Sequence, residues 1–184
     1  MGMVDLAPWS RAQVLSLPAD GKRYELIDGE LLVTPTPRLD HQRVVRALNR
    51  LLDAHCLAHR LGDVFELPAD LEVEPGQLTS PDLFVLPLGA AFHRWEEAPR
   101  PLLVIEVLSP STARYDRGLK RRFYQRAGVP EYWIVDADAR LIERWRPDDE
   151  RPEVIGETLT WSPRLDGAVL TIDVRRLFVE ELEY

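Results

Sequence analysis

The chain has 184 residues, a hydrophobic fraction of 45% and a formal net charge of −8. This size and composition predict one globular domain over residues 1–184, with a core at about 23–178, and the net acidity argues against indiscriminate nucleic-acid binding. No apolar run reaches the roughly 20 residues that a membrane span requires, so we expect no membrane association. The first residues lack a signal pattern, and the single cysteine, Cys56, cannot form an internal disulfide. Both features favour a cytoplasmic location.

The N-terminal part is expected to hold a short helix, a β-hairpin and a long helix. Ser10 is a suitable N-cap for the short helix, and Asp28-Gly29 is the strongest hairpin signal in the chain. Val44, Val45 and Leu48 belong to an apolar series at helical spacing that predicts the long helix. The expected ranges are 11–17 for the short helix, 23–27 and 30–34 for the hairpin strands and 41–59 for the long helix.

The rest of the chain alternates short β-rich runs with two further helices. The first of these helices is expected to end at Gly128, with Pro130 beyond it as a stop signal. The expected strands are 64–67, 71–73, 82–86, 102–107, 132–136, 141–145, 154–161 and 169–172, and the expected helices are 115–127 and 174–181. This order predicts an α/β fold with an N-terminal hairpin and a C-terminal hairpin.

Two carboxylates stand out because each lies in a segment that is otherwise typical of a buried strand. Asp82 opens the run 82–86, and Glu106 interrupts the run 102–108. Burying a carboxylate is costly unless a partner neutralises it, and a divalent cation is one such partner. For Asp82 the alternative is a turn in which its side chain bonds to local backbone. Both residues are candidates for a metal site that serves phosphate chemistry.

Antiparallel pairing of these two strands would bring the carboxylates together. The start of one strand would then lie beside the end of the other, which is where Asp82 and Glu106 stand. Alternation along each strand places Asp82 with Phe84 and Glu106 with Val104. The two side chains meet if the register puts these residues on the same face.

Lys120 is the third candidate, and it is one of only two lysines among 23 basic residues. It shares a helical face with Phe123 and Tyr124, so we expect it to lean inward. Its ammonium would then reach a phosphate oxygen or a metal-bound water. A lysine that snorkels at the rim of an apolar face explains the same spacing.

The same helix carries a basic strip. From Arg114 to Arg126, six basic residues face a single acid, Asp116, which gives a local balance of +5. Arg114, Arg117 and Arg121 are therefore candidates for nucleic-acid binding, although a solvated helix face explains the strip equally well.

Taken together, these residues resemble the Uma-two family of restriction-endonuclease-like proteins, which belongs to the PD-(D/E)xK nuclease superfamily. The resemblance covers roughly residues 24–178, nearly the whole chain. It is carried by Tyr24–Leu31, His41-Gln42, Pro81-Asp82, Glu106 within Ile105–Thr112, Lys120 and Gly128–Asp136.

The resemblance implies a restriction-endonuclease-like fold, in which α-helices flank a mixed β-sheet. It also implies Mg²⁺, with Mn²⁺ as a substitute, held by Asp82, Glu106 and the backbone carbonyl of Val107. The metal would activate a water and neutralise charge at the scissile phosphate, and Lys120 would orient that water or stabilise the transition state. The implied activity is hydrolysis of phosphodiester bonds in nucleic acid, most readily DNA. The accessory candidates are Glu30, His41 and Tyr124.

One departure from the superfamily pattern leaves alternatives open. Leu108 stands two residues after Glu106, where the lysine is usually found, so Lys120 must supply the ammonium from the helix. A catalytically silent module that keeps the nuclease fold and binds nucleic acid or protein is the main rival. Metal-assisted hydrolysis of another phosphate ester would use the same residues. A homodimer would let two sites cut both strands of a duplex, although nothing in the sequence requires it.

Overall fold

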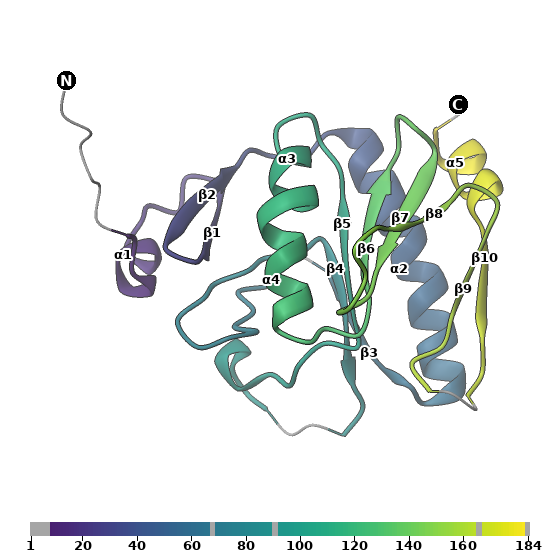
Figure 1. The fold of residues 1–184 in the computed structure, drawn as a ribbon, viewed down its shortest axis with the longest axis horizontal. Helices are drawn as coiled ribbons and strands as arrows, with labels where there is room; N and C mark the ends of the chain where they lie inside the picture. Colours follow the sequence, from purple (N-terminus) through teal and green to yellow (C-terminus); the bar gives the residue numbers. More distant parts are fainter. Residues whose placement is uncertain (1–7, 67–68, 90–91, 165–166, 183–184) are drawn as a thin grey trace.

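The computed structural model describes residues 8–66, 69–89, 92–164 and 167–182, and a six-stranded sheet lies at its centre (Figure 1). The strands follow the order β3-β4-β5-β6-β7-β8. In this sheet β5 and β6 run parallel, and every other neighbouring pair is antiparallel. The strands are β3 (Gly62–Glu66), β4 (Leu83–Pro87), β5 (Leu103–Val107), β6 (Tyr132–Asp136), β7 (Leu141–Trp145) and β8 (Glu153–Ile155).

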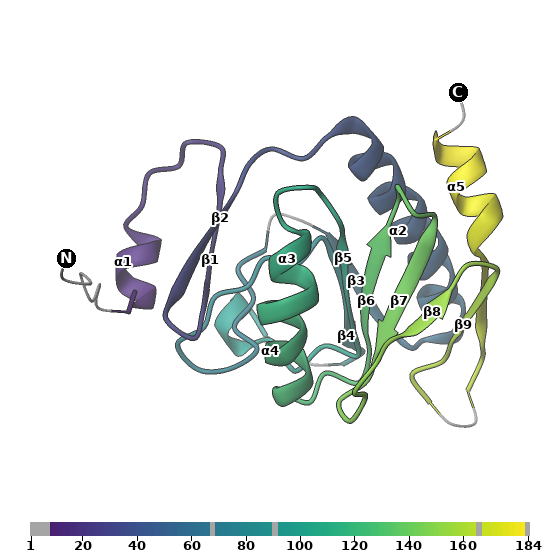
Figure 2. The ribbon, with the colours of Figure 1, turned by 45° about the horizontal axis from the view of Figure 1, so that its top comes forward.

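One face of the sheet is covered by helix α2 (Leu39–His59), helix α5 (Val174–Leu182) and the hairpin formed by β9 (Thr158–Trp161) and β10 (Leu170–Asp173) (Figures 1 and 2). This side of the core receives the alternate residues Leu83 and Val85 of β4, among others. In β5 the residues at 103, 105 and 107 point to the same side. Burial of these positions fixes the faces of both central strands.

The other face is covered by one continuous helical segment and by the N-terminal hairpin. The segment consists of α3 (Ala113–Tyr115), a π-helical turn η2 (Asp116–Lys120) and α4 (Arg121–Arg126), and the hairpin strands are β1 (Arg23–Ile27) and β2 (Glu30–Thr34). Phe84 and Val104 pack here with Phe123, as do Ile27 and Leu32 from the hairpin. A short helix, α1 (Arg11–Leu15), packs on the outer side of the hairpin, and a short 3₁₀ turn, η1 (Trp95–Glu97), follows β4.

Local sequence signals account for the elements that were expected. Asp28 and Gly29 both adopt positive φ angles, 52° and 79°, as a tight hairpin turn requires. The hairpin register pairs Ile27 with Glu30. Ser10 caps α1 through a capping box with Gln13. The long helix predicted from the amphipathic pattern is confirmed as α2, which has 21 residues. Among the described residues, no helix is long and apolar enough to cross a membrane.

Three expected elements differ in the structure. Leu71 forms only an isolated bridge with Thr79, so the strand expected at 71–73 is absent. The strand expected at 154–161 is divided at Gly156, because β8 pairs with β7 in the central sheet whereas β9 pairs with β10 in a separate one. The helix expected from residue 115 begins at Ala113 and contains the π-helical turn, which the sequence did not indicate. Residue 67, the expected end of β3, lies outside the described residues.

Gly62 on the edge strand β3 offers a test of the sheet packing. A Cβ atom at this position would overlap the carbonyl oxygen of Leu86 and lie 2.9 Å from Val85 Cγ1. We expect Gly62→Ala to lower the free energy of unfolding by about 1–3 kcal/mol through overpacking, as measured by urea denaturation. Gly156→Ala is the control, because a Cβ there meets no atom within 4 Å. Equal stability of the two variants would contradict this close approach of β3 to β4.

Candidate active site

The pairing of β4 with β5 brings the two strand-borne carboxylates together. The strands are antiparallel, with Leu83 opposite Ile105, so Asp82 lies across from Glu106 just beyond the paired residues. Both carboxylates lie on the sheet face that carries α4, and their residues are only 1% and 2% exposed. The antiparallel pairing predicted from the sequence is confirmed.

Asp82 is held by three donors that come from different parts of the chain. Arg23 Nη1 donates to its Oδ1 at 2.8 Å, the backbone N–H of Val107 donates to its Oδ2 at 2.8 Å, and His41 Nε2 lies 3.0 Å from Oδ2. Burial by itself would raise the pKa of Asp82, but His41 and Arg23 hold it at about 2. The side chain is therefore a fixed carboxylate rather than a capping group for local backbone.

Lys120 is buried among three carboxylates. Its Nζ lies 2.8 Å from Glu25 Oε2, 2.9 Å from Glu106 Oε1 and 3.5 Å from Asp116 Oδ1. Burial would lower the pKa of Lys120, but these carboxylates raise it well above its ordinary value, so the side chain stays an ammonium. The π-helical turn places Asp116 and Lys120 at its two ends, with both side chains buried. Lys120 does not snorkel to the surface.

The site carries more negative than positive charge. Its four carboxylates belong to Glu25, Asp82, Glu106 and Asp116. Two permanent cations, Arg23 and Lys120, oppose them, so these six groups carry a formal charge of −2 when all four carboxylates are ionised. Burial raises the pKa of Glu106 and of Asp116, and repulsion from neighbouring carboxylates raises both further. A divalent cation would remove this excess of negative charge.

A cavity of about 220 Å³ opens onto the carboxylates. Asp82, Glu106, Val107, His41 and Lys120 all line it, together with the connection from β2 to α2. Among the described residues, no group of three or more His, Cys, Asp or Glu side chains is arranged as a complete metal cage. Mg²⁺ is commonly held by only one or two carboxylates, with waters and substrate oxygens completing its shell. Two carboxylates that face one cavity, with excess negative charge around them, fit that mode of binding.

The structure also brings in residues that sequence reasoning did not select. Arg23, Glu25 and Asp116 all contact the central groups, whereas Glu30 is exposed at the hairpin turn and does not line the cavity. A glutamate in the apolar strand Tyr24–Ile27 was a usable signal for Glu25, because such a strand buries its charge only with a partner. No comparable pattern marked Arg23.

Tyr124 lies in the wall behind the lysine. It is fully buried and packs against Phe123 and Tyr132. Burial raises the pKa of the Tyr124 hydroxyl well above its ordinary value, and the nearby Glu106 carboxylate adds to this effect. Tyr124 is therefore a neutral neighbour of the cluster.

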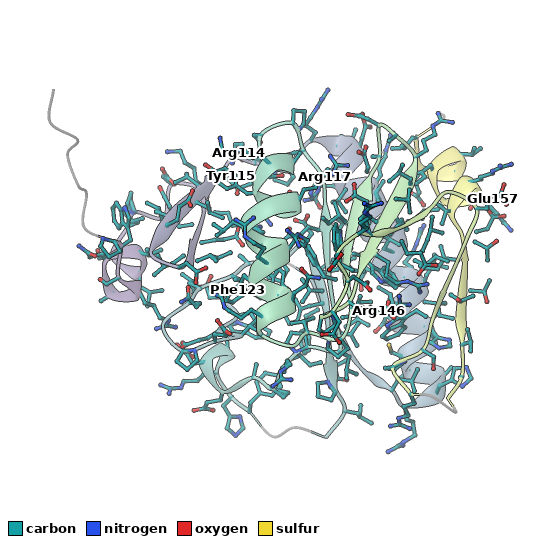
Figure 3. The ribbon with its side chains drawn as sticks, viewed as in Figure 1. Arg114, Tyr115, Arg117, Phe123, Arg146 and Glu157 are labelled. Atoms are coloured by element: carbon teal, nitrogen blue, oxygen red, sulfur yellow. The ribbon has the colours of Figure 1, made fainter. Side chains whose placement is uncertain are left out.

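The three arginines expected to bind nucleic acid lie along the outer side of the helical segment. Arg117 forms ion pairs with Asp136 and Glu143, and the Arg121 guanidinium lies 4.8 Å from the ring centroid of Trp145. Figure 3 shows Arg114 and Arg117 near the beginning of the segment, with Phe123 farther along it. The three arginines do not line the cavity that the carboxylates face.

Lys120→Met tests whether the ammonium holds the buried carboxylates together. We expect a loss of about 3–5 kcal/mol in the free energy of unfolding, because removal of one partner leaves buried charge unpaired. Without the ammonium, Glu106 and Asp116 retain protons in the folded state to higher pH than in the unfolded state. The stability deficit should therefore increase as the pH rises and shrink as it falls.

Lys22→Met is the matched control for this measurement. Lys22 pairs with Asp20, and its side chain is 53% exposed. We expect no measurable change in stability for this variant. Chemical denaturation at acidic and alkaline pH compares the two proteins, and a pH-independent deficit in Lys120→Met would contradict the proposed origin of the effect.

The chain is similar to known proteins over most of its length. The family model Uma2, described as "Putative restriction endonuclease", matches residues 11–174. The chain is 24% identical over 155 residues to "Uncharacterized protein sll1609" of Synechocystis sp., with 82% of this chain and 87% of that protein covered. It superposes with a TM-score of 0.75 and 21% identity on a crystal structure described as "a putative nuclease belonging to DUF820" from Anabaena variabilis, with 95% of this chain and 100% of the other covered. The central mixed sheet and its flanking helices are thus a nuclease fold, and the chain belongs to the Uma2 family.

Proposed function

We propose that the protein is a Mg²⁺-dependent endonuclease that hydrolyses phosphodiester bonds of nucleic acid, with DNA as the main substrate and Mn²⁺ as an alternative metal. The observation that carries this proposal is the buried pair Asp82 and Glu106, which faces one cavity with Lys120 beside it. The excess negative charge of the cluster suits a divalent cation. Membership of a family described as "Putative restriction endonuclease" supports the same class of substrate.

Asp82, Glu106 and the carbonyl of Val107 are the groups proposed to hold the metal. All three residues line the cavity, and the N–H of Val107 already bonds to Asp82, which fixes the end of β5 against the start of β4. A bound Mg²⁺ would supply an activated water and charge neutralisation at the phosphate. Arg23 and His41 orient the Asp82 carboxylate for this task.

Lys120 is proposed to stabilise the negative charge that develops on the phosphate. Its ammonium is preorganised, because Glu25 and Asp116 contact it from the protein side while Glu106 contacts it at the cavity. Glu25 itself is fixed by the backbone N–H of Ser80, which donates to Oε1 at 2.9 Å. Lys120 therefore keeps carboxylate partners even when Glu106 engages another cation.

The three outer arginines are proposed to contact the nucleic-acid backbone. Arg114 and Arg117 are exposed near the beginning of the helical segment, and Arg121 is partly exposed farther along it, so their guanidinium groups can approach a nucleic-acid backbone. Arg117 would have to exchange Asp136 and Glu143 for a phosphate.

A homodimer would place two such sites on one duplex, and light scattering of the purified protein measures whether it forms.

Glu106→Gln tests the proposed activity. We expect purified wild-type protein to cleave DNA in the presence of Mg²⁺ or Mn²⁺, and the variant to lose at least about a hundredfold in rate, because a metal ligand and a lysine partner are removed together. Glu157→Gln is the control. Glu157 is an exposed glutamate in the short connection between β8 and β9, it pairs with Arg175, and it does not line the cavity. Supercoiled, linear and single-stranded DNA serve as substrates.

The outcome of this assay separates the proposal from its rival. Equal cleavage rates of Glu106→Gln and Glu157→Gln would show that Glu106 takes no part in catalysis. Folded wild-type protein that binds DNA and cleaves none of the substrates would instead identify a catalytically silent module.

Metal binding can be measured without any substrate. We expect isothermal titration with Mn²⁺ to show one site in the wild type and in Glu157→Gln, and at least about tenfold weaker binding in Glu106→Gln, because one of two carboxylate ligands is lost. Chelation of the metal should abolish cleavage, and added Mg²⁺ should restore it. Unchanged Mn²⁺ affinity in Glu106→Gln would place the metal elsewhere.

A further inference from the structure

The cavity that holds the carboxylates shares part of its wall with each of two further cavities. The larger neighbour, about 450 Å³, shares Arg23 and residues 34–37 with it, and the other, about 330 Å³, shares Arg38, His41, Ser109 and Pro110. The shared wall is largely the connection from β2 to α2, which runs past α3 to the start of α2 in Figures 1 and 2. A strand that crosses the carboxylates would therefore run along this connection.

Arg38 differs from the other cations that line the central cavity. Arg23 and His41 contact Asp82, and Lys120 is surrounded by carboxylates. Among the described residues, by contrast, the exposed guanidinium of Arg38 forms no hydrogen bond or ion pair. It is a permanent charge at the edge of the candidate active site with its donors available to a ligand.

The surroundings of Arg38 suit an anion. Arg38 is the N-cap residue of the 21-residue helix α2, and no side chain caps that end, so its N-terminal N–H groups and dipole face the same region. Ser109, Ser111 and Thr112 line the same cavity, and Ser109 Oγ lies 3.0 Å from Ser111 Oγ and 2.9 Å from Thr112 Oγ1. These groups can donate hydrogen bonds to phosphate oxygens.

A separate observation indicates a ligand at this place. His41 is 7% exposed and lines both cavities next to Arg38, and its Nδ1 is buried without a hydrogen-bond partner among the described residues. Buried polar atoms are normally paired, and His41 lines the cavity, so a ligand bound there is a candidate partner for this nitrogen.

We propose that Arg38, the N-terminus of α2 and the hydroxyl groups at residues 109–112 form a phosphate subsite that binds the nucleic-acid phosphate next to the scissile one. The subsite rests on the proposed nuclease function and adds to it a specific position on the substrate strand. Arg38 fixes the register of that strand and takes no part in the chemistry at the carboxylates. Because phosphate contacts carry no base information, the subsite positions the substrate without selecting its sequence.

Arg38→Ala tests the subsite by binding alone. Fluorescence anisotropy with a short single-stranded DNA, in Ca²⁺ in place of Mg²⁺, should show about tenfold weaker binding than wild type, the size expected for one charge-assisted contact. The slope of log affinity against log salt should fall by about 0.7, the value for one released counterion on a single strand. Arg122→Ala is the control: it removes the same charge from an exposed arginine that lines none of the three cavities and has no hydrogen bond or ion pair among the described residues.

A set of oligonucleotides, each with one neutral methylphosphonate, locates the contact. One position should weaken wild-type binding about tenfold and leave Arg38→Ala unaffected, since the partner charge is already gone. Equal behaviour of Arg38→Ala and Arg122→Ala, or a methylphosphonate effect that persists in Arg38→Ala, would overturn the subsite alone. Wild-type protein that neither binds nor cleaves DNA or RNA would overturn the proposed function and the subsite together. Thermal unfolding of both variants establishes that they are folded.

Discussion

The contact between the Lys120 ammonium and three buried carboxylates is the interaction on which this site depends. A single buried ammonium or carboxylate would be too costly to desolvate, so each group is present only because the others are. Glu25, Glu106 and Asp116 come from the hairpin, the sheet and the helical segment, respectively. The cluster therefore joins three parts of the fold at one point, and it leaves Glu106 with one carboxylate oxygen that is not used by the lysine.

The need to pair the buried charges accounts for the positions of β1 and of the π-helical turn. The N-terminal hairpin does more than extend the structure, because β1 supplies Arg23 to Asp82 and Glu25 to Lys120. The π-helical turn brings Asp116 and Lys120 inward together from positions four residues apart. Local departures from regular helix are common at functional sites, and this turn directs both side chains into the buried cluster.

The site also explains how the chain tolerates its departure from the superfamily pattern. Leu108, directly after β5, occupies the usual lysine position and is partly buried against the apolar cluster beside α4. The ammonium reaches Glu106 from the helix instead, at 2.9 Å. The proposed chemistry requires a cation at a fixed place beside the carboxylates, and a helix packed on the same sheet face can supply it as well as the strand can.

The sequence alone predicted most of the elements and selected the three central side chains, Asp82, Glu106 and Lys120. Alternation in 82–86 and 102–107, the Asp28-Gly29 turn and the inward helical face of Lys120 are local patterns, and local patterns depend only on backbone geometry and on which residues avoid water. How the hairpin and α2 pack against the sheet decided the contacts of Arg23, Glu25 and His41. The same packing placed Arg38 beside the cavity, with no ion pair to another described residue. Only the tertiary structure decided these, because pairing between charges distant in the chain leaves no periodic signal in the sequence, whereas burial of apolar residues does.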